Sequence, residues 1–389
     1  MDLHTRFEAA EAAVDRRLED LVRLSHEVHA HPELCFEERV SSALTADALS
    51  AAGFAVTWGT AGMETAFVAE CGSGPLVVAV CAEYDALPNV GHACGHNVIA
   101  ATAVGAGVGL APVADALGLT VRVVGTPAEE GGGGKITMVE HGTFDDVHLA
   151  MMVHPWPEDR LEAACLAVAH FDVELTGRTA HASAAPWQGI NAADAMVVAQ
   201  VAIGLLRQQL PPGDQVHGVV TSGGEAANIV PSRVTGRFMA RSRTLEGLQA
   251  LLPRVRACFE AGALATGCEV AFTPVAHDYS HMESDGDLLG LYRTNAEALG
   301  RRFTADDAGA PLPTLSTDMA NVSLAVPSIH PLLGIDAQGA VNHQPEFAAA
   351  CITGSADAAV RDGALAMAWT AIDAASGPVR DRLLARPRG

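Results

Sequence analysis

At 389 residues the chain is longer than a single hydrophobic core usually becomes, so we expect two domains. Its formal net charge of −22 argues against nucleic acid and against anionic membrane surfaces as partners. Hydrophobic residues make up 49% of the chain and aromatic residues only 5%, which favours an α/β protein whose interior is mostly Ala, Val, Leu and Gly.

The cellular compartment expected from the sequence is the reducing cytoplasm. Eight cysteines are scattered along the chain without the spacing of a disulfide scaffold. Acidic residues such as Glu8 and Glu11 stand where a signal peptide would carry its basic and apolar regions. We find no uninterrupted apolar stretch of transmembrane length, so we expect no membrane contact.

Two helices are expected at the start of the chain. Apolar residues at helical spacing predict an amphipathic helix over residues 3–30, which ends before His31 and Pro32 because proline restricts the residue that precedes it. A second helix is expected near residues 38–52. Two short strands should follow, at residues 54–58 and 65–71.

Three apolar strands come next, and each is followed by polar residues. The strands are expected at 76–81, 119–124 and 148–153, and the polar residues after them are Glu83 and Asp85, Glu129 and Glu130, and His154. A helix of small residues at 98–110 separates the first two strands, which implies a parallel sheet. Ligands of parallel sheets gather at the carboxyl ends of the strands, so we expect one site there.

The loop at residues 91–97, with the sequence GHACGHN, supplies further groups suited to a metal. Cys94 and His96 are two residues apart, and small neighbours allow the loop to direct both side chains at one cation. Thiolate and imidazole are ligands of zinc and other transition metals. The alternative is a buried cysteine beside a surface histidine, which explains an isolated Cys-x-His but leaves the other polar clusters unexplained.

Four glycines at 131–134 followed by Lys135 suggest a phosphate-binding loop, but the pattern does not hold. The motif G-x-x-x-x-G-K-[ST] requires a glycine at position 129 and a Ser or Thr at position 136, where this chain has Glu129 and Ile136. We therefore interpret the glycines as flexible backbone packed close to a metal centre.

Residues 166–280 form a segment of different character, which we expect to be an inserted domain. Its strands are expected at 169–175, 215–222, 233–241 and 268–275, and its helices at 191–209 and 245–264. This order suits a four-stranded antiparallel sheet with two helices on one face, a ferredoxin-like α+β domain. Residues 281–389 should then rejoin residues 1–165, with a helix near 286–299, a strand ending near His330 and one long closing helix from about 348 to 375.

Four motifs, taken in order along the chain, resemble the aminoacylase–amidohydrolase branch of metallopeptidase family 20. They are EYDALP at 83–88, GHACGHN at 91–97, PAEEGG at 127–132 and TAHAS at 179–183. Together with STDM at 316–319, the first motif is most similar to the aminobenzoyl-glutamate hydrolase and peptidase-domain-containing subgroup. The resemblance implies an α/β/α catalytic domain with a mixed, largely parallel sheet, a dinuclear metal site and an inserted lid or dimerisation domain.

The resemblance also implies roles for individual residues. Two divalent metal ions, zinc or manganese with cobalt and nickel as further candidates, would be held by Cys94, His96, Glu130, His154 and His343. Glu129 would be the general base that activates a metal-bound water. Asp85 would be a carboxylate that stabilises the metal ligands without binding the metal itself. The family usually has a histidine where this chain has Glu83, so the part that Glu83 plays stays open.

Three residues of the inserted domain match positions that the family uses on its substrate. His181 would stabilise the oxyanion, and Asn228 and Arg241 would contact the substrate. Arg241 can form a bidentate ion pair with a substrate carboxylate, but it can equally pair with an acidic residue on the surface. The resemblance further implies a homodimer in which lid domains pair edge to edge and each His181 enters the partner's site.

These observations predict a metal-dependent amidohydrolase that acts on a small-molecule amide, either an N-acyl amino acid or a dipeptide-like compound such as aminobenzoyl-glutamate. The alternative is a metal-holding regulatory or scaffold protein that has kept the fold and lost turnover. A decayed enzyme tends to lose its base, whereas Glu129 is present here with all five ligands. A hydrolase that uses Cys94 as nucleophile is a weaker hypothesis, since Cys94 has no dedicated orienting triad.

Overall fold

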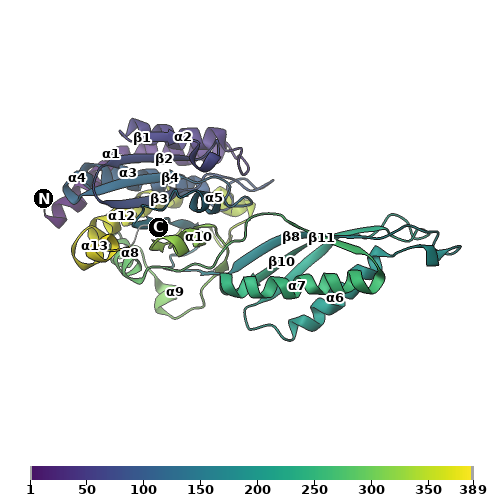
Figure 1. Cartoon of the computed structure of the whole chain (residues 1–389). Helices are drawn as coiled ribbons and strands as arrows, with labels where there is room; N and C mark the ends of the chain where they lie inside the picture. Colours follow the sequence, from purple (N-terminus) through teal and green to yellow (C-terminus); the bar gives the residue numbers. More distant parts are fainter. Residues whose placement is uncertain (1, 387–389) are drawn as a thin grey trace. The chain divides into compact units, whose positions relative to one another are not determined.

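The chain folds into two compact units (Figure 1). Unit 1 comprises Met1–Ala164 and Met282–Gly389, and unit 2 is Cys165–His281. The computed structural model of the protein describes residues 2–386. Unit 2 therefore begins one residue before the insertion expected at 166–280 and ends one residue after it.

A six-stranded mixed sheet forms the centre of unit 1. Its strand order is β1 (Ala55–Trp58), β2 (Phe67–Gly72), β4 (Leu119–Gly125), β3 (Leu76–Ala82), β5 (Leu149–Met151) and β13 (Ser328–Ile329). The pairs β3–β4, β3–β5 and β5–β13 are parallel, whereas β1–β2 and β2–β4 are antiparallel. Every residue of β3 is buried, as expected of a central parallel strand covered on both faces. The predicted mixed, largely parallel sheet is confirmed.

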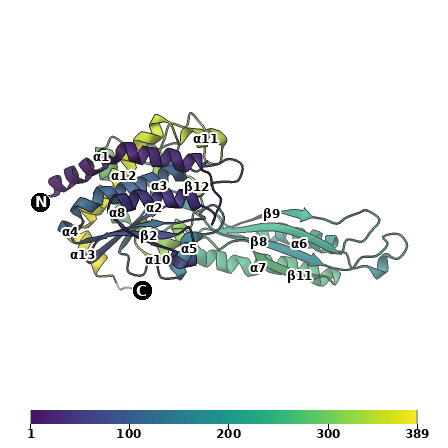
Figure 2. The ribbon, with the colours of Figure 1, turned by 90° about the horizontal axis from the view of Figure 1, so that it is seen from above.

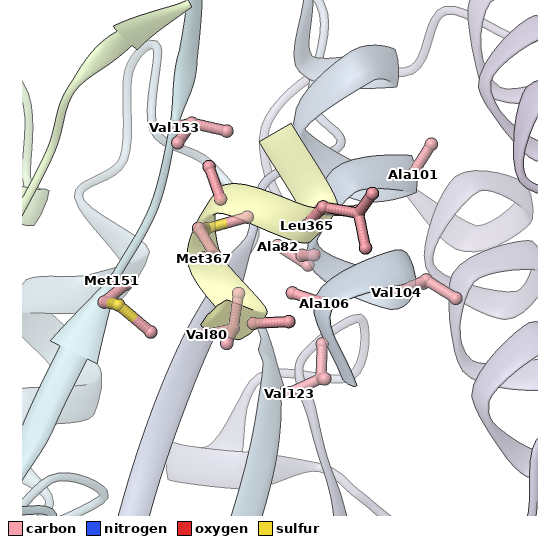
Figure 3. Close-up of a cluster of buried hydrophobic side chains, with 14 of the residues drawn as sticks. Val80, Ala82, Ala101, Val104, Ala106, Val123, Met151, Val153, Leu365 and Met367 are labelled. Atoms are coloured by element: carbon pink, nitrogen blue, oxygen red, sulfur yellow. The ribbon is translucent and has the colours of Figure 1, made fainter. Parts of the chain in front are cut away.

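Helices cover both faces of this sheet. On one face lie α1 (Leu3–Ala30), α2 (Arg39–Ala51), α3 (His96–Leu110) and α12 (Gly354–Ala374), and Figure 2 shows the first three running side by side. Val80 of β3 packs toward α3 and α12 in this core (Figure 3), whereas its neighbours Ala79 and Cys81 belong to a second core. That second core includes residues of α5 (Gly134–Glu140) and α10 (Met319–Ala325). The alternation of side chains along β3 thus produces three layers, α/β/α, as predicted.

Several short elements complete unit 1. They are η1 (Thr60–Gly62), η2 (Ala111–Val113), α4 (Ala114–Leu117), β6 (His154–Trp156), α8 (Gly286–Ala298), α9 (Thr304–Asp307), β14 (Leu332–Gly334), α11 (Pro345–Ala350) and α13 (Gly377–Leu384), with β7 (Ala164–Cys165) and β12 (Thr314–Leu315) near the boundary of the two units. The strand expected at 148–153 is shorter than predicted, because the chain leaves the central sheet after Met151 and pairs again as β6 with β14.

Two expectations about helices are wrong. The closing helix is interrupted between α11 and α12, where Thr353 adopts an extended conformation and its hydroxyl donates to the carbonyl of Ala350. This local hydrogen bond competes with helix continuation. The segment His96–Leu117 is also long and apolar enough to cross a membrane by length and composition, contrary to expectation, yet 83% of its most apolar window is buried inside the protein. This segment comprises α3, η2 and α4 and belongs to the core of unit 1.

Unit 2 has the predicted ferredoxin-like organisation. Its antiparallel sheet has the order β11 (Glu269–Pro274), β8 (Ala167–Thr176), β10 (Arg233–Ser242) and β9 (Gln215–Ser222). Two helices, α6 (Ala192–Arg207) and α7 (Leu245–Thr266), pack against each other and against this sheet, and η3 (Pro186–Gln188) precedes them. A separate apolar core joins these elements, with Phe171, Phe238 and Phe259 in mutual ring contact.

The close contact between α3 and α12 generates a test of the core. A methyl group at Gly105 would lie 2.7 Å from the Cβ of Ala364, whereas a methyl group at Gly290 of α8 would meet no heavy atom within 4 Å. We expect Gly105→Ala to lower the free energy of unfolding by about 1–3 kcal/mol through overpacking. Gly290→Ala should be neutral or stabilising by up to about 1 kcal/mol. Denaturant unfolding measures both, and equal stability of the two variants would contradict the packing described.

Candidate metal centre

The polar side chains that follow the strands of unit 1 meet at one edge of the sheet. Glu83 and Asp85 follow β3, Glu129 and Glu130 follow β4, Cys94 precedes α3, His96 is its first residue, His154 begins β6, and His343 precedes α11. All of these positions lie at carboxyl ends of parallel strands or in loops beside them, which is where sheets of this type bind ligands.

Two groups of potential ligands share the thiol of Cys94. One group contains Cys94, His96 and His154, and the other contains Cys94, Glu130 and His343. Within each group the ligand atoms all lie within 4.8 Å of one another. The structure therefore brings together the five side chains expected to hold metal, in an arrangement suited to two neighbouring cations with a thiolate between them.

Hydrogen bonds orient two of the imidazoles toward the site. His96 Nδ1 donates to the Asp85 Oδ1 atom and to the Asp85 carbonyl, both at 2.9 Å, and His154 Nδ1 donates to the carbonyl of Pro155 at 2.9 Å. In both rings Nε2 is then left to bind a cation, which is the usual arrangement of metal-bound histidine. Asp85 also accepts the backbone N–H of Glu130 at 2.9 Å, so it steadies two sides of the site at once.

Several buried polar atoms at the site have no hydrogen-bond partner. A bound metal ion would satisfy such atoms, so their presence tests whether a metal fits. They are His96 Nε2, Glu83 Oε2 and Glu130 Oε1. Leaving such an atom unsatisfied costs about 1–3 kcal/mol, more when it is charged. Glu130 Oε1 lies 3.8 Å from His96 Nε2, and Glu130 Oε2 lies 4.0 Å from His343 Nε2, so Glu130 faces both groups of ligands. These donors fit divalent cations.

Burial has opposite effects on two of the candidate ligands, His154 and Cys94. Burial lowers the pKa of His154 to about 4, which keeps this imidazole in the neutral form that binds metals. Burial raises the pKa of the Cys94 thiol well above its usual range, and the carboxylate of Glu130 adds to the effect. A thiolate at this position therefore requires a cation beside it.

The turn that carries Glu129 and Glu130 is held in a strained conformation. Ala128 has φ of 61°, in the left-handed region that residues with a side chain rarely adopt. Glu38, which precedes α2, accepts the N–H of Ala128 at 2.9 Å and so stabilises this turn. Burial raises the pKa of Glu129, and the carboxylates of Glu83 and Glu130 raise it further. A buried carboxylate with a raised pKa is suited to accepting a proton near neutral pH.

The sequence did not predict that Lys135 lies at the site and pairs with two of its carboxylates. The ammonium group of Lys135 is fully buried and lies 2.5 Å from Glu83 Oε1 and 2.6 Å from Asp318 Oδ1. Burial would lower the pKa of Lys135, but Asp318 and Glu83 outweigh this and raise it. The glycines at 131–134 drew attention to a phosphate loop, whereas the informative signal is a lysine that follows the two glutamates after β4, separated from them by those four glycines. Glu38 was missed as well, and no sequence pattern marks it.

The three predicted substrate residues lie in unit 2, at two different ends of its sheet. The loops of His181 and Asn228 are neighbours, because the Ala182 N–H donates to the Asn228 carbonyl at 3.0 Å. His181 Nδ1 accepts the backbone N–H of Ala184 at 3.2 Å, so the neutral ring carries its hydrogen on Nε2. These two loops lie at the end of the sheet where β10 begins with Arg233. Arg241 lies at the opposite end of β10, eight residues further on, which at the usual rise per residue is about 27 Å from Arg233. Its guanidinium contacts His217 Nε2 at 3.3 Å.

Comparison with known proteins identifies the family whose model this chain matches. The model of peptidase family M20/M25/M40 matches residues 79–361. The Xaa-Arg dipeptidase of Mus musculus is 38% identical over 374 residues, which cover 92% of this chain and 86% of the relative. One component of the p-aminobenzoyl-glutamate hydrolase of Escherichia coli is 32% identical over 264 residues, 62% of this chain and 55% of the relative.

A solved structure shares the fold at low sequence identity. It is described as a dinuclear metal-binding peptidase of the M20 family from Bacillus subtilis, and it superposes with a TM-score of 0.68 at 21% identity. The match covers 91% of this chain and 98% of that structure. The likeness extends over both units of this chain.

The shared thiol generates a prediction about metal content. Cys94→Ala should remove a ligand from both groups and lower the bound metal at both positions, since one sulfur serves the two. Cys351→Ala is the matched control, because Cys351 is also a buried free cysteine but belongs to neither group. Elemental analysis of purified protein after equilibration with zinc checks both variants. Full metal occupancy in Cys94→Ala would remove this residue from the site.

Proposed function

This chain belongs to peptidase family M20/M25/M40 and is a metal-dependent hydrolase of that family, and we propose that it cleaves the amide bond of N-acyl amino acids or small dipeptides. The observation that carries the proposal is the pair of ligand groups sharing Cys94, with the carboxylate of Glu129 beside them. A site that only held metal would not need this further carboxylate, whereas amide hydrolysis needs a proton acceptor.

Each residue then has a defined task in the reaction. Cys94, His96, Glu130, His154 and His343 would hold two cations, whose charge would polarise the amide carbonyl and lower the pKa of a water. Glu129 takes the proton of the attacking water and returns it to the leaving amine. Asp85 keeps His96 in its binding orientation through the 2.9 Å hydrogen bond. Zinc or manganese is the proposed native metal, since thiolate, imidazole and carboxylate together accept either.

The proposed substrate is a linear amide with a free carboxylate on its amino-acid side. Support comes from the two relatives, one described as a dipeptidase for Xaa-Arg and the other as part of a hydrolase of p-aminobenzoyl-glutamate. The first of these relatives matches nearly the whole chain, so Xaa-Arg dipeptides are the first compounds to test. Arg241 is the proposed partner of the substrate carboxylate, because a guanidinium binds a carboxylate with two parallel hydrogen bonds.

We further propose that two copies of the chain assemble through unit 2. His181 and Asn228 lie in loops at the Arg233 end of β10, and Arg241 lies eight residues along this strand, about 27 Å from Arg233. One small substrate therefore cannot contact both ends of the same unit, but it can contact Arg241 of one copy and His181 of the other. Strand β9 is an edge of the sheet, and α6 exposes Val197, Val201 and Leu205 at 57%, 59% and 70% in a row along one face. An edge strand and an apolar helix face support pairing of two units.

The first prediction from this function concerns Glu129. Glu129→Gln keeps the size of the side chain and should keep bound metal, but it removes proton transfer and should lower kcat roughly 10²-fold or more. Glu140→Gln, at an exposed position that ends α5, is the matched control and should keep full activity. Hydrolysis of Xaa-Arg dipeptides, p-aminobenzoyl-glutamate and acyl amino acids provides the readout. If the parent protein binds metal but hydrolyses none of them, the scaffold hypothesis is favoured.

A second prediction concerns delivery of His181 by the partner. His181→Ala and Glu129→Gln should each be inactive alone, but random exchange of protomers should restore roughly a quarter of parental activity, because half the dimers are mixed and half of their sites are whole. Differently tagged protomers verify that exchange has taken place. If verified mixed dimers stay inactive, His181 does not act across the dimer, and the metal chemistry is unaffected by that result.

A further inference from the structure

The carboxylate of Glu38 is buried and hydrogen-bonded to three separate parts of unit 1. Its Oε1 atom accepts the N–H of Phe36 at 2.8 Å and the N–H of Ala128 at 2.9 Å. Its Oε2 atom accepts the hydroxyl of Thr65 at 2.9 Å. Phe36 and Ala128 both have φ in the left-handed region, at 65° and 61°. One carboxylate therefore stabilises two strained turns and fixes the distance between them.

A second buried side chain, Tyr84, connects Glu38 to the loop that follows β3. The hydroxyl of Tyr84 donates to the carbonyl of Thr65 at 2.5 Å, and the hydroxyl of Thr65 donates to Glu38. Tyr84 directly precedes Asp85, which accepts the N–H of Glu130 at 2.9 Å. The turn of the two glutamates is therefore bonded at two points, to Glu38 and to Asp85, and these two acceptors are themselves connected.

The residue between the two points is Glu129. The hydrogen bonds are made by the backbone N–H groups of Ala128 and Glu130, which are its neighbours on either side. Bonds to the backbone on both sides of a residue fix the direction in which its side chain leaves the chain. Buried charge is unfavourable, and strained residues and buried ionisable groups concentrate at active sites. Glu38 shows both features, since it is a buried acid that holds a strained turn.

We propose that Glu38 is a positioning residue for the general base Glu129, and that Thr65 and Tyr84 connect it to the loop of Asp85. The inference rests on the proposed function for the role of Glu129. Displacing a catalytic group by about 1 Å can lower the rate about 10²-fold, so loosening this turn should lower turnover. Glu130 keeps its own hydrogen bond to Asp85, so metal binding should persist.

The kinetic experiment compares two substitutions of Glu38 in metal-loaded protein. Glu38→Ala removes the acceptor of the Ala128 N–H and should lower kcat roughly 10–100-fold at a nearly unchanged KM and metal content. Glu38→Gln keeps an oxygen that can accept both N–H groups, so kcat should stay within about threefold of the parental value. Gly105→Ala is the control for lost stability, because the added methyl group would contact Ala364 and Leu21 rather than this network.

Hydrogen exchange followed by mass spectrometry provides a readout that does not depend on turnover. In Glu38→Ala the amides of the turn at residues 127–134 should exchange roughly tenfold faster or more, because a hydrogen bond to a charged group is lost. Tyr84→Phe removes only a hydroxyl and should accelerate exchange in the same turn to a smaller extent. Tyr292→Phe changes another buried tyrosine of unit 1, in α8, and is its matched control.

Three results would overturn the role of Glu38. They are a kcat of Glu38→Ala no lower than that of Gly105→Ala, unchanged exchange in the turn, and a Glu38→Gln variant as slow as Glu38→Ala, since loss of charge alone would then explain the effect. Should Glu38→Ala fail to fold, the exchange difference between Tyr84→Phe and Tyr292→Phe decides the question. If the parent protein binds metal but hydrolyses no amide, it is the proposed function that fails, whereas unchanged exchange in an active parent background refutes only the positioning role.

Discussion

Five carboxylates meet where β3 and β4 end, in a region from which water is largely excluded. They are Glu83, Asp85, Glu129, Glu130 and Asp318. Burying this much negative charge is unfavourable unless positive charge balances it. The ammonium group of Lys135 balances part of it by contacting two of the carboxylates, and His96 lies between others. Divalent cations would supply the rest, so metal binding and the stability of this edge of the sheet are coupled.

The backbone is strained at two points beside this charge cluster. Ala128 and His343 both have φ in the left-handed region, at 61° and 71°. Each such residue costs on the order of 1 kcal/mol or more and persists only where the surroundings hold it. Glu38 holds the N–H of Ala128, and the carbonyl of Ala93 accepts the N–H of His343 at 2.9 Å. The second of these bonds ties the His343 loop directly to the loop of Cys94.

Periodicity and motifs were enough to predict most of the fold, and they named the five side chains that the structure brings together as candidate metal ligands. Long amphipathic or fully apolar segments such as α1 and β3 have one favourable way to bury their side chains, so their bounds could be predicted within a residue or two. Polar residues directly after apolar strands indicated the edge of the sheet that carries the site. The break between α11 and α12 was not predicted, because it depends on one side-chain hydrogen bond of Thr353.

The sequence by itself determined which residues are available at the strand ends, because ligand type and spacing are local properties of the chain. Only the tertiary structure decided how they are combined. That Cys94 serves two groups of ligands, that Glu38 supports the turn of Glu129, and that Lys135 lies between Glu83 and Asp318 all depend on contacts between distant segments. Lys135 and Asp318 are 183 positions apart, and no local pattern encodes such a pairing. It arises only when α5 and α10 pack on the same face of the sheet.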